Sequence, residues 1–158
     1  MGWFFGFKLH ILINDKGELM AFKITQADVD DRQSVDFLSQ GLIGKMIGDK
    51  GYISKKIFEK LYRRGLKLIT QILKNMKNKL MLLTDKLLLR KRAVVESVID
   101  PLKNISQIEH SRHRSPMNFL VNLLAGLAAY CLQPKKPSLN LKNRLALKIM
   151  CRVNASNY

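Results

Sequence analysis

An alternation of large apolar residues near the start of the chain constrains the fold more than any other feature of the sequence. Every second residue from Phe5 to Ile13 is a large apolar residue. Successive side chains of a β-strand point to opposite faces, so this period of two predicts a strand over residues 3–13. A turn signal follows at residues 14–17, and residues 18–25 predict a second strand. The chain is therefore expected to begin with a β-hairpin.

Helix and strand patterns follow one another after this hairpin. Caps such as Ser54, glycines at helix ends such as Gly65, and the spacing of apolar residues define the segments. Pro101 marks either the end of a helix or a kink in it. A hairpin that leads into alternating helices and strands predicts one mixed sheet flanked by helices, which is an α/β fold. The expected segments are a helix from Asp30 or Asp31 to about Gln40, a strand over 45–48, a helix over 54–65, a strand over 66–72, a helix over 84–99 and a helix over 117–132.

The C-terminal residues differ in character from the rest. Pro134 and Pro137 interrupt regular structure, and residues 139–158 form a basic amphipathic stretch whose order the pattern does not decide. We therefore divide the chain into a domain over residues 1–133 and a basic C-terminal tail over residues 134–158.

Basic residues outnumber acidic residues by a wide margin. The chain carries 28 Lys/Arg and 12 Asp/Glu, which gives a formal net charge of +16 and a pI of about 10.1. Residues 1–40 hold six of the acidic residues and only four of the basic ones, so the excess lies in the rest of the chain. Such a charge favours a polyanion as partner, nucleic acid ahead of an anionic membrane surface. A basic surface without a partner is the remaining interpretation.

The longest apolar segment is short for a membrane span. Residues 117–132 are interrupted by Asn118 and Asn122, whereas a spanning helix needs about 20 apolar residues. We expect a buried helix there and no membrane partner. Cys131 and Cys151 lack the spacing of a zinc site or a disulfide framework. The start of the chain lacks a signal-peptide pattern, and together these features predict a cytoplasmic protein.

Asp49 lies in the segment GDKGY and is one of only six acidic residues after residue 40. A helix cap, an ion pair or a metal ligand would each account for a carboxylate in so basic a region. Asp49 ends the strand predicted over 45–48, and open α/β sheets bind ligands at the carboxyl ends of their strands. Gly48 and Gly51 permit a tight turn and the close approach of a ligand. Asp49 is therefore a candidate ligand, and a turn-forming role is the alternative.

Arg92, Glu96 and Lys103 follow a second pattern of interest. Seven residues return a helix to nearly the same face, so these side chains share a face if the helix continues past Pro101. Acidic side chains can hold Mg²⁺ for phosphodiester chemistry, and nearby Lys and Arg can hold phosphates. The alternative is that these residues and Asp100 form ion pairs on a solvated helix.

Four segments, in this order, resemble the C-terminal half of bacterial insertion-sequence transposases of the DDE superfamily. The segments are GWFFGFKLH, GKMIGDKGYIS, MKN and LRKRAVVESVIDPLKNISQIEHSRHRS, and the likeness covers about residues 2–138. The family often has Tyr three residues before the Arg of its Arg-x₃-Glu-x₆-Lys pattern, where this chain has Leu89. The resemblance implies an RNase H-like mixed sheet for the predicted domain. The Arg-x₃-Glu-x₆-Lys pattern, the strongest piece, is met by Arg92, Glu96 and Lys103.

The resemblance also implies roles for individual residues. Asp49 would be the second acidic ligand and Glu96 the third. Together they would hold Mg²⁺ for hydrolysis at the transposon end and for attack of the freed 3′-hydroxyl on target DNA. Arg92 and Lys103 would steady DNA phosphates near the cut. From charge alone we add Lys50, Lys74, Lys77 and Arg90 as further phosphate contacts.

The family carries its first catalytic Asp on a strand that precedes the hairpin, and this sequence begins at the hairpin. Asp15 lies in the turn, and the acidic residues from Asp28 to Asp31 follow the second strand. We therefore expect an N-terminally truncated DNA transposase, incomplete at the N-terminus of its sheet and inactive alone, that is associated with the nucleoid.

Two other functions stay open at this point. One is a DNA-binding remnant without catalysis, in which the charge alone acts. The other is a membrane-associated basic protein that uses residues 117–132 and the tail. The sequence also leaves open whether two copies form a homodimer.

Overall fold

The chain folds into the α/β structure described here from a computed structural model, which describes residues 6–71, 81–90, 93–104, 110–111, 115–138 and 147–157. The strands are β1 (Gly6–Asn14), β2 (Leu19–Gln26), β3 (Gly44–Gly48), β4 (Leu66–Thr70), β5 (His110–Ser111) and β6 (Leu147–Asn157). The helices are α1 (Arg32–Leu38), the 3₁₀ turn η1 (Lys50–Tyr52), α2 (Lys55–Arg63), α3 (Leu83–Arg90), α4 (Ala93–Asn104) and α5 (Pro116–Leu132).

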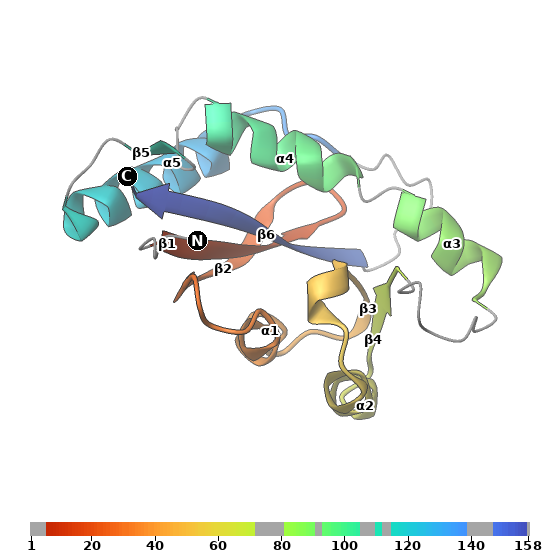
Figure 1. Cartoon of the computed structure of the whole chain (residues 1–158). Helices are drawn as coiled ribbons and strands as arrows, with labels where there is room; N and C mark the ends of the chain where they lie inside the picture. Colours follow the sequence, from red (N-terminus) through yellow and green to blue (C-terminus); the bar gives the residue numbers. More distant parts are fainter. Residues whose placement is uncertain are drawn as a thin grey trace.

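A mixed sheet runs through the structure in the strand order β2-β1-β6-β3-β4, and β5 pairs with β6. β1 and β2 form the predicted antiparallel hairpin, which is confirmed. β3 and β4 are parallel, and α2 lies between them in the chain. β6 lies antiparallel to β1 and parallel to β3. The last strand of the chain therefore joins two pairs of strands that precede it (Figure 1).

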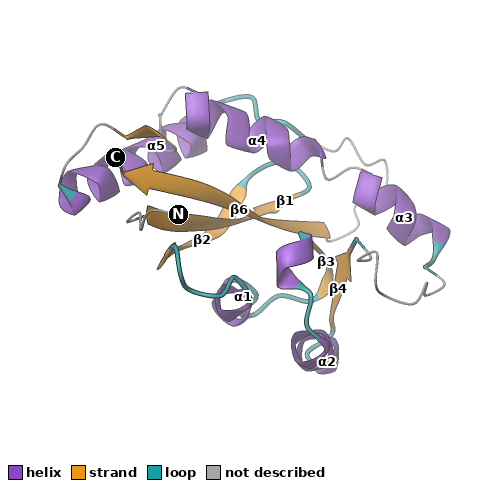
Figure 2. Cartoon of the chain, in the orientation of Figure 1, coloured by secondary structure: helices purple, strands orange, loops and turns teal. Residues whose placement is uncertain are grey.

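Helices cover both faces of the sheet, as Figure 2 shows. One face packs against α4, α5 and part of α3, and the other packs against α1, η1 and α2. The alternation in β1 divides its side chains between these two clusters, because neighbouring residues of a strand face opposite ways. The first cluster contains Leu9, Ile11, Ile13, Ile47, Leu88, Val95, Val98, Leu102, Phe119, Leu123, Leu127, Tyr130 and Ile149. The second contains Leu12, Val35, Leu38, Met46, Tyr52, Leu61, Leu66, Leu68 and Met150.

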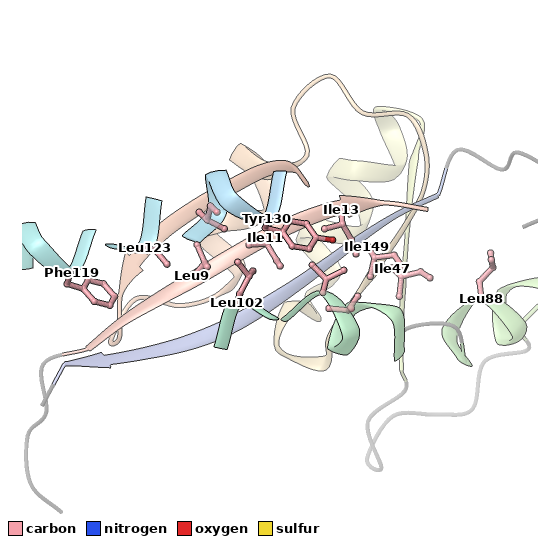
Figure 3. Packing of buried hydrophobic residues seen from close by; sticks show 13 residues of the cluster. Leu9, Ile11, Ile13, Ile47, Leu88, Leu102, Phe119, Leu123, Tyr130 and Ile149 are labelled. Atoms are coloured by element: carbon pink, nitrogen blue, oxygen red, sulfur yellow. The ribbon is translucent and has the colours of Figure 1, made fainter. Parts of the chain in front are cut away.

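A row of isoleucines crosses the sheet through β6. Ile149 pairs with Ile13 of β1 on one side and with Ile47 of β3 on the other, and Ile47 pairs with Ile69 of β4. All four side chains are buried. Figure 3 shows Ile13, Ile47 and Ile149 close together in the core. The sequence left the order of the C-terminal stretch undecided. Its residues 147–157 form a strand because their partners lie on both sides of them in the sheet.

In the region of the helix predicted over residues 84–99, the structure describes α3 (Leu83–Arg90) and α4 (Ala93–Asn104), and residues 91–92 lie outside the described residues. α4 continues through Pro101 to Asn104, so the proline does not end it. Proline removes one backbone donor and crowds the preceding turn, yet the buried stripe formed by Val95, Val98 and Leu102 continues across this position. The packing of α4 against the sheet thus overrides the local signal.

The apolar segment over 117–132 forms the predicted helix, α5, but it is buried on one face only, and Met117, Val121, Leu124 and Leu132 are exposed. Phe119, Leu123 and Leu127 are buried against the sheet. The hydroxyl of Tyr130 donates a hydrogen bond of 2.6 Å to the carbonyl oxygen of Gly17 in the hairpin turn. Across the part of the chain that the structure describes, no helix has the length and apolar character that a membrane crossing requires.

Candidate active site

Asp49 follows the last residue of β3 and caps the 3₁₀ turn η1. Its Oδ1 accepts a hydrogen bond of 2.7 Å from the backbone N–H of Lys50, and its carbonyl oxygen accepts one of 3.1 Å from the N–H of Tyr52. The residue is half-buried at the carboxyl end of a parallel strand. The turn-forming role considered for Asp49 is therefore present in the structure.

Asp49 follows β3, one face of which packs against α4. Ile47, two residues earlier, packs in the same cluster as Val95 of α4. Asp49 has an extended backbone with φ −74° and ψ 166°, so the alternation of β3 predicts its side chain on the side of Ile47. Gly48 faces the opposite cluster, where an added Cβ would lie 3.2 Å from Cδ1 of Leu68.

Glu96 lies on α4, next to the buried stripe by which the helix packs on the sheet. Val95 and Val98 are buried, while Glu96 itself is exposed. Since α4 continues to Asn104, Glu96 and Lys103 occupy the same helix face two turns apart. Glu96 thus lies on the helix that packs on one face of β3, and Asp49 lies at the end of that strand. That both carboxylates lie on one side of the sheet and converge on one metal ion stays a prediction.

A buried polar cluster holds the turn after Asp49 against β1. Nδ1 of His10 lies 3.0 Å from the Tyr52 hydroxyl, and Nε2 lies 3.0 Å from Oγ1 of Thr25. A neutral imidazole has one donor and one acceptor, and hydroxyl groups can serve either, so both ring nitrogens have suitable partners. His10 is therefore part of the support of the turn.

Gly51 lies in the same turn and is packed closely against α1's start. A Cβ atom at Gly51 would lie 2.9 Å from Oδ2 of Asp31, closer than ordinary contacts allow. Asp31 is held by an ion pair of 3.1 Å with Lys8 of β1. The glycine is thus required by neighbouring protein atoms, which is a different reason from the close approach of a ligand that the sequence suggested.

The basic residues expected to contact phosphates are distributed over several elements. Lys50 opens η1 and Arg90 ends α3, and both are exposed, while Lys103 is half-buried on α4. Lys50 is next to Asp49 in the turn. The remaining three, Lys74, Lys77 and Arg92, lie outside the described residues.

Asp85 is a buried carboxylate that the sequence did not single out. It is 1% exposed, and its two oxygens each lie 2.7 Å from a lysine nitrogen, of Lys45 and of Lys67. Burial raises the pKa of this carboxyl, but the hydrogen bonds from both lysines outweigh burial and lower the pKa below its ordinary value of 3.8. These two ion pairs attach the start of α3 to β3 and β4. In the sequence, only the scarcity of acidic residues in this region pointed to Asp85.

The donor atoms suit a hard cation, although their number is small. Carboxylate oxygens are the ligands that Mg²⁺ prefers, and Asp49 and Glu96 supply two such groups. Within residues 6–71, 81–90, 93–104 and the other described ranges, no group of three His, Cys, Asp or Glu residues could hold a metal ion. The type of ligand therefore fits, and a third acidic ligand is not found among these residues.

Three features define the class of this protein. They are a mixed α/β sheet, acidic residues at the end of a sheet strand and on the helix that covers the sheet, and a net charge of +16. The class is that of basic α/β domains acting on nucleic acid. The sequence pattern of the family described as Transposase DDE domain matches residues 1–116. This match covers more than half of the chain, which therefore belongs to that family. No match was found among curated proteins or among solved structures.

Family membership confirms the resemblance found in the sequence and the RNase H-like α/β fold expected from it. It makes the chain a transposase by family, with DNA as the substrate and a divalent metal as the general cofactor of the family. α5 and β6 lie beyond the matched residues, so the strand in the middle of the sheet is outside the region of likeness.

Proposed function

We propose that this chain is a DNA transposase domain in which Asp49 and Glu96 are the carboxylates that hold Mg²⁺ at the reacting phosphodiester. The observation that supports the proposal is that Asp49 follows β3 at its carboxyl end and Glu96 lies on α4, the helix whose Val95 shares a core cluster with Ile47 of β3. The reaction class is hydrolysis at a transposon end, followed by strand transfer into target DNA.

The chain's own residues bind and orient the DNA in this reaction. Lys50 is next to Asp49 on η1, and Lys103 lies on the same face of α4 as Glu96, two turns away. Their ammonium groups can neutralise phosphate oxygens. Arg90 extends the basic surface along α3, and Lys74, Lys77 and Arg92 complete the proposed set. When bound, Mg²⁺ would polarise the phosphate and activate the attacking oxygen.

We further propose that the chain does not cleave DNA by itself. The support is that the described residues contain no third acidic ligand beside Asp49 and Glu96. β6 is the strand next to β3, and its residues Leu147–Asn157 include no Asp or Glu. A site with two carboxylates should bind a divalent cation weakly.

Calorimetric titration with Mn²⁺ tests the metal site. The full chain is expected to bind Mn²⁺, and Asp49→Asn or Glu96→Gln should each weaken binding by roughly tenfold or more. Asp100→Asn removes an exposed acid one turn from Glu96 on the same helix and should leave binding unchanged. Equal binding by all four proteins would contradict the assignment.

A plasmid-nicking assay in Mg²⁺ or Mn²⁺ tests the absence of cleavage. We expect the chain alone to leave supercoiled DNA intact. Nicking that disappears in both Asp49→Asn and Glu96→Gln would refute the proposed inactivity and would support the assignment of the two carboxylates.

A DNA-binding remnant without catalysis is the second candidate, and the net charge of +16 favours it. It predicts salt-sensitive DNA binding that is indifferent to sequence. It also predicts that Mn²⁺ binding is absent, or unaffected by the two substitutions, so the titration above separates the candidates.

A further inference from the structure

The outward side of α2 carries two exposed aromatic rings that the proposed site does not use. Phe58 and Tyr62 lie one helical turn apart and stack on each other, with ring centroids 6.0 Å apart and planes inclined by 12°. Their side chains are 42% and 64% exposed. The helix attaches to the sheet through Leu61, which is buried, so this aromatic pair is not required for its packing.

The helix that carries this aromatic pair is basic, since residues 55–64 contain five Lys/Arg and one Glu. Lys60 forms an ion pair of 2.7 Å with Asp36, and Lys55 lies 3.9 Å from Glu59. Lys56 and Arg63 are exposed, and the helical period places them across Glu59 from the two rings. The surface is therefore aromatic and cationic at once, which suits a ligand with flat rings and negative charge.

Unpaired nucleic acid has that chemistry. Proteins bind single strands by stacking bases on aromatic rings and by neutralising phosphates with Lys and Arg, with little dependence on sequence. A paired duplex hides its base faces and would use only the charge. A second protein molecule would match an apolar surface better than one with this excess of positive charge.

We propose that the outward face of α2 binds unpaired nucleic acid, with bases stacked on Phe58 and Tyr62 and phosphates held by Lys56 and Arg63. Ser54, the cap of α2, comes five residues after Asp49, and α2 lies on the side of the sheet opposite α4 (Figure 1). The outward face of α2 is therefore a contact surface separate from the proposed metal site. The choice of DNA as ligand rests on the proposed function.

Binding of a fluorescein-labelled oligothymidine of about 12 nucleotides, a length within usual single-strand site sizes, tests the proposal. Fluorescence anisotropy is measured on the full chain at low salt in EDTA. Phe58→Ala with Tyr62→Ala should weaken binding at least about fivefold per ring, the lower bound for base–aromatic stacking. Lys56→Gln with Arg63→Gln should lower the slope of log K against log salt by about 1.4, since each phosphate contact contributes about 0.7.

Two controls separate stacking from other effects. Tyr62→Phe keeps the ring and should keep oligothymidine binding. Leu132→Ala removes an exposed apolar side chain of α5 (84% exposed) and should also leave binding unchanged. Circular dichroism and a thermal melt verify that each variant is folded.

The result that overturns the proposal is a folded double-alanine variant that binds oligothymidine as tightly as the unsubstituted chain. If sedimentation then shows that only the unsubstituted chain self-associates, the aromatic pair is a contact between two copies. Mn²⁺ titration does not involve Phe58 or Tyr62, so failure at α2 and failure of the metal site are distinguishable.

Discussion

His10 and Tyr52 are 42 residues apart in the chain and are joined by a buried contact of 3.0 Å between Nδ1 and the phenolic oxygen. The contact ties the middle of β1 to the last residue of η1. Because η1 begins directly after Asp49, the hairpin strand positions the turn that carries the proposed ligand. The support of this turn therefore comes from the face of the sheet that α1, η1 and α2 cover.

Tyr52→Phe should destabilise the fold and weaken Mn²⁺ binding. The substitution leaves Nδ1 of His10 buried without its partner, which costs about 1–2 kcal/mol of the free energy of unfolding. Urea unfolding gives this value. Tyr62→Phe, at a tyrosine that is 64% exposed, should change stability by less than about 0.5 kcal/mol, and equal effects at the two positions would show that the contact has no energetic role.

Gly51→Ala should also destabilise the turn. An alanine at a compatible position gains about 0.4–1 kcal/mol by restricting the unfolded chain, whereas overpacking costs about 1–3 kcal/mol. The new Cβ would lie 2.9 Å from Oδ2 of Asp31, and Lys8 restrains that carboxylate, so we expect a net loss of about 1 kcal/mol. In an Asp31→Ala background, this loss of unfolding free energy should vanish. A Gly51→Ala protein as stable as the unsubstituted chain would contradict the argument.

Asp85→Asn should lower the free energy of unfolding by about 1.5–3 kcal/mol, because a buried carboxylate with two lysine partners loses its charge-assisted hydrogen bonds. Asp36→Asn is the matched control. Its carboxylate also lies 2.7 Å from a lysine, Lys60, but is 51% exposed, so we expect less than about 1 kcal/mol. Chemical denaturation of both variants at neutral pH compares the two, and a cost at Asp36 as large as at Asp85 would show that burial is irrelevant.

The contribution of Asp85 should depend on pH in a defined direction. The pKa of Asp85 is lowered in the folded protein from the ordinary value of 3.8, so the unfolded chain binds a proton more readily. The stabilisation is therefore complete well above pH 3.8 and is lost as pH falls through the lower pKa of the folded state. The difference in unfolding free energy between the unsubstituted chain and Asp85→Asn should be constant near neutral pH and shrink in acid. A difference that grows as pH falls below 3.8 would contradict the direction of the shift.

Ile149→Ala should lower the free energy of unfolding by about 2–4 kcal/mol, the usual range for truncating a buried isoleucine. Ile149 is fully buried and pairs with residues of both β1 and β3, so the loss affects both halves of the sheet. Thermal unfolding followed by circular dichroism measures it. Leu132→Ala on the exposed side of α5 should be nearly neutral, and a neutral Ile149→Ala would mean that β6 contributes little to the fold.

Local signals in the sequence were sufficient for the elements with strong periodicity or clear caps. The alternation from Phe5 to Ile13 predicted β1, and Ser54 caps α2 with its side chain as expected, accepting from the N–H of Ile57. Asp30 likewise accepts a hydrogen bond of 2.9 Å from the N–H of Arg32 at the start of α1. The alternation of side chains in β1 and the cap hydrogen bonds between near neighbours at α1 and α2 are local features, so a short window of sequence contains them.

Features that depend on distant partners could not be predicted in this way. β6 is a strand because Ile149 meets Ile13 and Ile47, neither of which is close to it in the chain. Asp85 is charged and buried because two lysines from other strands reach it. The roles of Asp49 and Glu96 came from the resemblance, since the spacing of acids alone fitted a solvated helix equally well.

The central place of β6 bears on how this protein is made. Residues 147–157 are synthesised after every other described strand. At about 5–20 residues per second, several seconds separate the synthesis of β4 from that of β6, the strand that connects the two earlier strand pairs. During that interval β1 and β3 each present an open edge, on which a chaperone or a neighbouring nascent chain could form the missing hydrogen bonds.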